Sequence, residues 1–192
     1  MKNLIHRGVA SALFIFILVV CIGAGTTALG QSKHISATAR GTSTQMGRIV
    51  NVDIRINSLS PPSDQAILLE AFQSDGSEGL ANALDKMRSK GRVAITGTIG
   101  YDLNYIRRFN MPDGSVKIRF VTDRPIFFGE HWNSTRSLDY QLCVGEVIIR
   151  QGKGKSSGTI MPATRLRLNK KGDLELETYQ NPWELVNIKV WK

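Results

Sequence analysis

From Arg92 to the end of the chain, apolar and polar residues alternate in short runs separated by turn residues, and this pattern constrains the fold most strongly. Successive side chains of a strand point to opposite faces of a sheet, so such alternation indicates strands with one buried face. In the run 116–123, for example, Val116, Ile118 and Phe120 would share the inner face. This part of the chain therefore predicts an antiparallel sheet.

The region before Arg92 adds one strand and a helical insertion. Residues 48–57, RIVNVDIRIN, alternate in the same way. Residues 63–72 start with a capping serine and an acidic residue in the first turn, which indicates a helix. Residues 77–90 have helical spacing, with an apolar stripe at Leu80, Ala83, Leu84 and Met87. We therefore predict an α+β fold that is mainly antiparallel β, with about seven strands, barrel-like or sandwich-like, and one inserted helical pair.

The N-terminus has the order of a secretory signal peptide: basic residues, an apolar stretch, then small residues. The apolar stretch 9–24 reaches only ~24 Å as a helix, short of the ~30 Å of a bilayer core, which disfavours an uncleaved anchor. Cleavage after Gly30 is expected, and a lipoprotein at Cys21 is disfavoured because Val20 precedes the cysteine. The predicted organisation is a signal peptide at 1–30, a flexible lead-in at 31–47 and one domain at 48–192.

Removing residues 1–30 lowers the formal charge of +9 by two, and the positive excess gathers in one segment. Residues 150–171 contain seven basic side chains and no acidic one. On one face of a sheet they would present a positive field to an anionic lipid, a glycan or an acidic protein. The alternative is a solvated face that keeps the protein soluble. The candidates for binding an anionic surface are Arg150, Lys153, Lys155, Arg165, Arg167, Lys170 and Lys171.

The segment TDRPIFFGEHW, residues 122–132, gathers the clustered candidates for chemistry. Its proline disfavours a central strand, so we expect a corner or a bulge of the sheet. Two readings stay open: a pocket rim, or a corner with a structural ion pair and core aromatics. As a site, it offers Asp123, Glu130 and His131 as catalytic groups, and Arg124 and Trp132 as ligand-binding groups.

Other chemistries find little support in the sequence. His34 and His131 are the histidines that remain after cleavage, too few for a zinc site, and no calcium loop or cofactor motif is present. The segment QGKGKSSGT lacks the spacing of a phosphate-binding loop. Cys143 has no local partner that would activate a thiol, so we interpret it as a strand cysteine. We expect no metal, no cofactor and no nucleic-acid partner.

Three segments together resemble a group of exported bacterial proteins of unknown function. They are FVTDRPIFFGE at 120–130, GEVIIRQGKGKSSGTIMPATRLRL at 145–168 and LELETYQNPWELVNI at 174–188. The resemblance covers roughly residues 48–192. It implies a bacterial source and a location in the envelope, and it assigns no catalytic or binding residue.

Three functions are compatible with these observations. The first is a non-enzymatic, exported domain of the bacterial envelope, periplasmic or extracellular, that binds a ligand or a partner. The second is a secreted hydrolase acting on a glycan or another anionic substrate through Asp123, Glu130 and His131. The third is a structural protein that self-associates through an edge strand. The first is favoured because nucleophile, metal and cofactor motifs are missing from the sequence.

Overall fold

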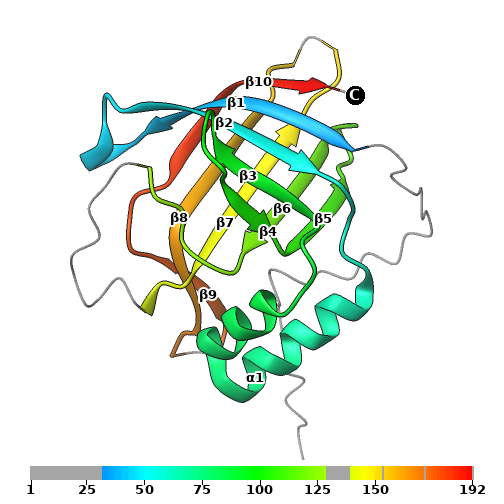
Figure 1. Ribbon diagram of the computed structural model, residues 1–192, viewed down its shortest axis with the longest axis vertical. Coiled ribbons are helices and arrows are strands. Elements are labelled where there is room, and N and C mark those ends of the chain that lie inside the picture. Colours follow the sequence, from blue (N-terminus) through cyan, green and yellow to red (C-terminus); the bar gives the residue numbers. More distant parts are fainter. Residues whose placement is uncertain (1–31, 129–138, 153, 171, 192) are drawn as a thin grey trace, which may run out of the picture.

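A computed structural model describes residues 32–128, 139–152, 154–170 and 172–191. They form ten strands, one long helix and a short 3-10 turn, η1, at Ser43–Gln45 (Figure 1). The elements, in chain order, are β1 Lys33–Gly41, β2 Ile49–Ile56, α1 Pro62–Asp85, β3 Gly91–Ile95, β4 Tyr101–Leu103, β5 Tyr105–Asn110, β6 Val116–Thr122, β7 Leu142–Ile149, β8 Ser157–Leu168, β9 Leu174–Thr178 and β10 Trp183–Trp191.

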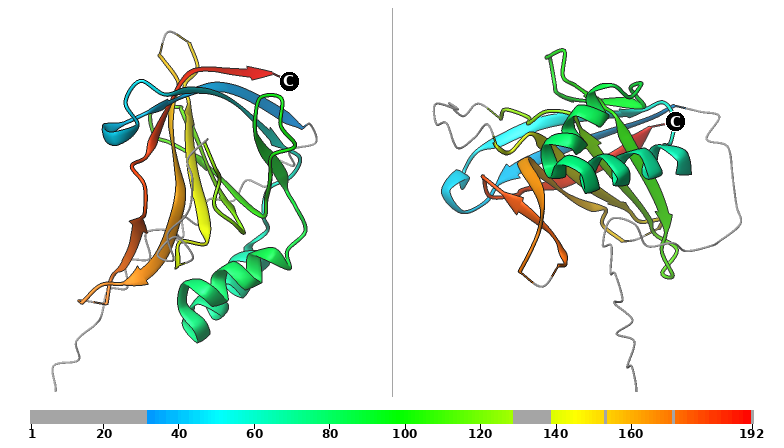
Figure 2. Two further views of the ribbon diagram at one scale, coloured as in Figure 1. Left: turned by 60° about the vertical axis from the view of Figure 1, so that its left-hand side comes forward. Right: turned by 90° about the horizontal axis from the view of Figure 1, so that it is seen from below.

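All ten strands belong to one antiparallel sheet, which curls into a nearly closed barrel. The strand order is β4-β3-β2-β1-β10-β8-β7-β6-β5, and β9 pairs with β8 outside this path. Figure 2 shows β3 and β4 facing β7 and β8 across the interior. The mainly antiparallel fold is thus confirmed, and its form is barrel-like. The expected number of strands was too low.

The predicted flexible lead-in at 31–47 is wrong, because β1 occupies most of it. This strand lies between β2 and β10, and Ile35, Ala37 and Ala39 are buried in the barrel. Its apolar positions are mostly alanines between polar residues, so the alternation has little hydrophobic contrast. Pairing on both edges stabilises the strand, and that pairing depends on residues far away in the sequence.

The larger hydrophobic core fills the barrel interior. Phe120 and Val147 from β6 and β7 meet Trp183 and Leu185 from β10 there, all at most 1% exposed. Cys143 belongs to this core and is fully buried, although the sequence alternation puts it on the more polar face of its strand. The reason is that both faces of β7 are covered at this point, one by the core and the other by α1.

A bulge on β8 changes which side of the sheet its residues face. Leu142 on β7 pairs with Thr164, whereas Val144 pairs with Met161, so β8 has one residue more than β7 between these pairs. A bulge of this kind shifts the alternation by one residue. Beyond it, Leu166 lies on the face opposite to the barrel interior, toward α1.

The helical insertion is a single element with a break. Asp75 and Gly76 have non-helical backbone angles within α1, and Gly76 has a φ of 59°. The expected pair of helices therefore corresponds to the two parts of α1, which run in different directions in Figure 1. The predicted stripe of the second part is confirmed: Leu84 is buried in a second core, and Leu80, Ala83 and Met87 pack against it. Within the described residues, no helix has the length and apolar character needed to span a membrane.

Candidate functional site

Asp123 and Arg124, two of the predicted site residues, form an ion pair just after the end of β6. Arg124 Nη2 lies 2.6 Å from Asp123 Oδ2, and the same guanidinium lies 3.7 Å from Asp85 Oδ1 at the end of α1. The Asp123 side chain is only 5% exposed, whereas that of Arg124 is 62% exposed. The corner of the sheet is thereby tied to the end of the helix.

The electrostatics of this pair do not suit acid catalysis. Burial raises the pKa of Asp123, but hydrogen bonding and attraction by Arg124 outweigh it, so the pKa lies below its usual value. A general acid near neutral pH needs a raised pKa instead. Asp123 is therefore a paired carboxylate with a structural role. Glu130, His131 and Trp132 lie outside the described residues.

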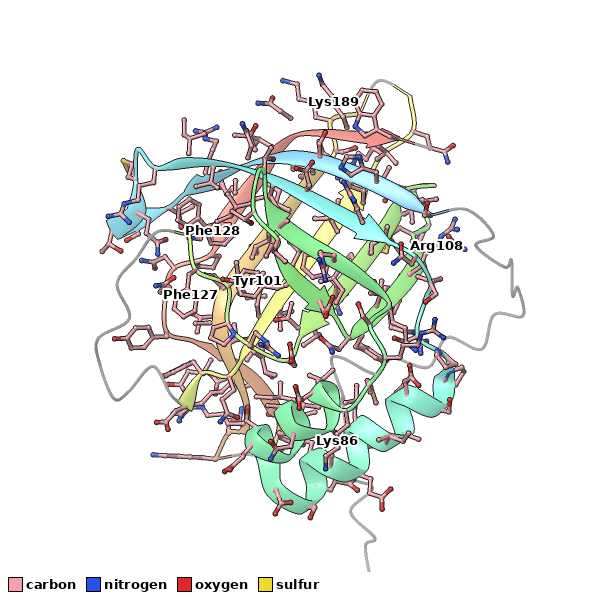
Figure 3. All side chains as sticks on the ribbon, viewed as in Figure 1. Lys86, Tyr101, Arg108, Phe127, Phe128 and Lys189 are labelled. Atoms are coloured by element: carbon pink, nitrogen blue, oxygen red, sulfur yellow. The ribbon has the colours of Figure 1, made fainter. Side chains whose placement is uncertain are left out.

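The aromatic residues of the same segment divide between core and surface. Phe128 stacks on Trp183 with 4.7 Å between ring centroids, and Ile126 is buried beside it. Phe127 is 41% exposed, and its backbone N–H donates to the Tyr101 hydroxyl. Figure 3 shows Tyr101, Phe127 and Phe128 close together at one side of the barrel. These contacts favour the structural interpretation of this corner.

The basic segment does not present Arg165 and Arg167 as free charges. Arg165 Nε lies 2.9 Å from Glu177 Oε2, and Arg167 lies 3.3 Å from both Glu175 and Glu177. The two glutamates are on β9, across the hairpin from β8. They follow the segment 150–171 in the sequence, and strand pairing brings them opposite the arginines.

The other residues of the basic segment are scattered. Arg150 Nη1 donates to the Lys155 carbonyl in the β7–β8 loop, and Lys155 and Lys170 are exposed. Lys153 and Lys171 lie outside the described residues. The expected positive face is therefore interrupted by the ion pairs of Arg165 and Arg167.

Tyr140 completes a polar cluster around Glu177. Its hydroxyl donates to Glu177 Oε1 at 2.9 Å, and the Arg165 guanidinium lies 5.0 Å from its ring centroid. Arg165, and then Tyr140, lower the pKa of Glu177, while burial raises the pKa of Tyr140. The cluster fixes the β8–β9 hairpin to the segment before β7.

A pocket that the sequence does not reveal lies between α1 and the sheet. It has a cavity of about 60 Å³, and the empty space rises to about 630 Å³ when the open solvent in front is included. Most of its lining side chains are hydrocarbon. The apolar lining residues are Leu68, Leu69, Phe72, Leu80 and Leu84 from α1; Val121, Leu142 and Val144 from β6 and β7; and Leu166, Leu174 and Leu176 from β8 and β9. The other two lining residues, Gln65 and Tyr105, have polar side chains.

This apolar trough, as we call the pocket and its open front, crosses five neighbouring strands. Its wall runs from Tyr105 on β5 to Leu174 and Leu176 on β9. Adjacent strands are about 4.8 Å apart, so the trough extends over roughly 19 Å. Leu168 pairs with Leu174 just beyond the wall and is 59% exposed. The alternation of leucines in the β8–β9 hairpin was the available sequence signal, but it does not reveal that α1 lies opposite.

The polar contacts of the trough lie at its β5 end. Arg107 Nη1 donates to Gln65 Oε1 at 2.9 Å, although Arg107 itself does not line the pocket. Burial raises the pKa of Tyr105, so its phenol stays neutral. Next to them, Lys90 Nζ lies 3.2 Å from Asp64 Oδ2, outside hydrogen-bonding geometry.

Few polar contacts hold α1 against the sheet. Asn104 Nδ2 donates to the Leu84 carbonyl at 3.0 Å, and the Leu166 N–H donates to Ser77 Oγ at 3.2 Å. Only four of the residues of α1 are buried: Leu68, Gly79, Ala81 and Leu84. The helix therefore covers the trough without sealing it.

In the parts of the chain that the structure describes, no group of three or more His, Cys, Asp or Glu side chains is arranged to hold a metal ion. Cys143 is fully buried, and burial raises the pKa of its thiol far above the usual value. A thiol in this state is a poor nucleophile. Its backbone N–H donates to Thr122 Oγ1, so the residue contributes to packing.

Comparisons with protein-family models, curated proteins and solved structures give no match for this chain.

Proposed function

We propose that the protein is an exported, non-enzymatic binding domain, and that its binding site is the apolar trough between α1 and β5–β9. The occupant would be an elongated, largely apolar small molecule. The observation that carries the proposal is the long, leucine-rich wall that α1 leaves partly open. The lining of the pocket is mainly hydrocarbon, as in sites that bind apolar small molecules.

The size of the cavity fits a chain-like ligand better than a compact one. Ordinary ligand pockets have volumes of about 300–1,000 Å³. The cavity here, at about 60 Å³, is much smaller, and its lining residues are spread over α1 and five strands. A narrow molecule lying across the strands would bury its length against Leu142, Leu166 and Leu176. The break at Asp75–Gly76 and the few buried helix residues would let α1 adjust to it.

The hydrolase alternative receives no support from Asp123, the catalytic candidate that lies among the described residues. Its carboxylate is bound to Arg124 and has a lowered pKa. Recognition of an anionic surface by the basic segment is also weakened, because Glu175 and Glu177 neutralise Arg165 and Arg167. The trough is therefore the better basis for a function.

Export and an envelope location belong to the same proposal. They rest on the basic, apolar and small-residue order of residues 1–30 and on the resemblance to exported bacterial proteins. Denaturing mass spectrometry of the protein recovered from its own host tests this. A chain that begins at Gln31 is expected, and a lipid adduct on Cys21 or an intact N-terminus would contradict cleavage at this site.

Binding in the trough can be tested with N-phenyl-1-naphthylamine, a neutral apolar dye whose fluorescence rises in apolar surroundings. We expect saturable binding to the full chain. Leu69→Trp should weaken it at least tenfold, because an indole at this half-buried wall position would fill the trough. Ile67→Trp is the matched control, since Ile67 lies on the same helix, is 52% exposed and does not line the trough.

Equal binding by both tryptophan variants would place the dye elsewhere and remove the support for this site. Absence of saturable binding to the unmodified protein would refute the proposed function.

A further inference from the structure

Three basic side chains share one carboxylate on the outer face of the barrel, where β5, β6 and β7 are neighbours (Figure 1). Glu146 Oε2 on β7 lies 2.6 Å from Arg119 Nε, and Glu146 Oε1 lies 3.4 Å from Lys117 Nζ, both on β6. Arg107 on β5 is the direct ladder partner of Arg119 and therefore lies on the same face. We call Arg107, Lys117, Arg119 and Glu146 the cationic cluster.

The cationic cluster has three positive charges and one negative charge, an excess of two. Both oxygens of Glu146 are engaged by the basic residues of β6. Among the described residues, the ion pairs do not include Arg107, whose Nη1 donates to the neutral Gln65 side chain. Lys90 and Asp64, next to Gln65 in the fold, form a pair of their own and leave the balance unchanged.

This imbalance differs from the charge pattern of the β8–β9 hairpin. There, Arg165 and Arg167 meet Glu175 and Glu177, so the numbers of positive and negative charges are equal. Pairing of that kind stabilises the hairpin without a ligand. In the cationic cluster, the described side chains supply only part of the negative charge that would balance the basic residues.

The positions of the basic residues make the excess charge costly. Like charges directly opposite one another on neighbouring strands destabilise a sheet, and Arg107 faces Arg119 in this way. The side chains of Lys117 and Arg119 are only 19% and 29% exposed, so water screens their repulsion incompletely. An anion bound over β5 and β6 would remove this repulsion.

We propose that the cationic cluster binds the phosphate group of a phosphate monoester. A monoester carries between one and a half and two negative charges at pH 7, close to the excess of the cluster, whereas a carboxylate or a phosphate diester carries one. Guanidinium groups match phosphate oxygens with two parallel hydrogen bonds, and a lysine adds a compact charge. Arg107 and Arg119 would donate to the phosphate oxygens, with Lys117 beside them.

This site is separate from the apolar trough, and the inference goes beyond the proposed function. The residues of the cationic cluster do not line the trough. Dye binding and phosphate binding can therefore fail independently of each other. Glu146 has a positioning role, because its carboxylate holds Arg119 and Lys117 on the sheet.

The first test is calorimetric titration of the full chain with glycerol 3-phosphate, a monoester, and with dimethyl phosphate, a diester, at equal ionic strength. We expect saturable binding of glycerol 3-phosphate with a Kd below about 1 mM, and at least roughly tenfold weaker binding of dimethyl phosphate. Equal affinities for the two compounds would overturn the ligand class.

Two variants of the cluster should change the affinity in opposite directions. Arg107→Gln should weaken binding of glycerol 3-phosphate by about tenfold to a hundredfold, the range for a hydrogen bond to a charged group. Glu146→Gln should tighten it, because the excess rises from two positive charges to three. Arg55→Gln is the control: Arg55 is exposed on β2, which is not a neighbour of β5, β6 or β7 in the sheet.

Weaker binding in Glu146→Gln, or an equal loss in Arg55→Gln and Arg107→Gln, would contradict the proposed site. If Arg107→Gln fails to fold, the comparison of the two phosphates on the unmodified protein and the Glu146→Gln variant still decide the question.

A second experiment distinguishes a soluble monoester from a lipid head group. Vesicles of phosphatidylcholine are mixed with phosphatidic acid, a monoester, or with phosphatidylglycerol, a diester, at equal surface charge. A preference for phosphatidic acid, without binding of glycerol 3-phosphate, would support the same ligand class on a lipid. Equal sedimentation with both vesicles, without binding of glycerol 3-phosphate, would indicate general attraction to an anionic membrane and overturn the inference. Absence of binding to either form of monoester would overturn it as well.

Discussion

Gly145 on β7 lies directly opposite Phe120 on β6, and the ring of Phe120 fills the space in which any other residue would carry its Cβ. Phe120 is fully buried in the barrel core. The contact joins two neighbouring strands inside the barrel. A single missing methyl group on one strand thus allows a large aromatic ring on the next.

Replacing Gly145 by alanine should destabilise the protein, because Phe120 would have to leave its position in a close-packed core. Overpacking of this kind typically costs about 1–3 kcal/mol in the free energy of unfolding, which urea denaturation measures. Adding Phe120→Leu should recover part of the loss, since the smaller side chain makes room. Gly154→Ala is the control: there the nearest atoms belong to the flexible Arg150 side chain in a loop. Equal losses at both glycines would contradict this explanation.

The Asp123–Arg124 pair predicts a dependence of stability on pH. Since Arg124 lowers the pKa of Asp123 in the folded protein, the unfolded chain takes up a proton at a higher pH than the folded one. The stabilisation is fully present well above 3.8, the ordinary pKa of an aspartate, and it is lost as the pH falls below that value toward the lower pKa of the folded state. Asp123→Asn should flatten the fall in unfolding free energy between about pH 5 and pH 3. Asp139→Asn, at a side chain that is 64% exposed, should leave the slope nearly unchanged.

Asn104 should be important for the attachment of α1. Its side chain is 4% exposed and donates to the Leu84 carbonyl near the end of the helix. Asn104→Ala leaves this carbonyl without its partner, which should cost about 1–3 kcal/mol in unfolding free energy. Amide exchange in α1 should accelerate more than in β1. Asn51→Ala, at an exposed position of β2, is expected to change neither quantity appreciably. Unchanged exchange in α1 would mean that apolar packing alone holds the helix.

Neutralising the β9 glutamates should create the positive surface that the sequence suggested. In a Glu175→Gln, Glu177→Gln double variant, Arg165 and Arg167 lose their carboxylate partners on β9, and Arg165 keeps only Asp139, whose Oδ2 lies 3.7 Å away. Two unmasked charges near an anionic membrane are worth about 1 kcal/mol each, so binding to phosphatidylglycerol vesicles at low salt should increase by up to roughly thirtyfold. Glu184→Gln, at an exposed position on β10, removes a negative charge away from these arginines and should have a smaller effect. A comparable increase in that variant would show that binding to the vesicles depends on the net charge of the protein alone.

Cys143 should resist thiol reagents in the folded protein. It is fully buried, and burial raises the pKa of its thiol. In a Cys21→Ser background, where Cys143 is the remaining cysteine, Ellman's reagent at pH 8 should react only as fast as the protein unfolds. Reaction should become rapid in urea. Rapid reaction without denaturant would contradict the burial of this residue.

Much of the fold could be predicted from local patterns. The alternation of Val52, Ile54 and Ile56 predicts β2 correctly, because these side chains differ strongly in polarity from those between them. The stripe at Leu80, Ala83 and Leu84 likewise predicts a helix face. In contrast, Ile99 continues an alternating pattern but lies in the turn between β3 and β4 and is 82% exposed. Alternation indicates a strand only where a neighbouring strand is available to pair with it.

The candidate site could not be predicted in the same way. The segment 122–132 was a candidate site because its polar and aromatic residues are close together in the sequence. In the folded protein, however, Asp123 is paired with Arg124 and Phe128 is packed in the core. The residues at the trough, in contrast, are far apart in the sequence. Gln65, for example, is hydrogen-bonded to Arg107, which lies 42 positions later in the chain. Nothing in the leucines of β9 indicates that they lie opposite Phe72 on α1.

Local patterns in the sequence are thus sufficient to predict the mainly antiparallel fold, the helical insertion and the hairpins, since each depends on the period of polarity or on turn residues within a few positions. Three features arise only in the folded chain: β1 is a central strand, the β8 bulge turns Leu166 toward α1, and Glu177 neutralises Arg165. These outcomes depend on register and on pairing between distant segments. The free energy of such contacts exists only once the chain has closed the intervening loops.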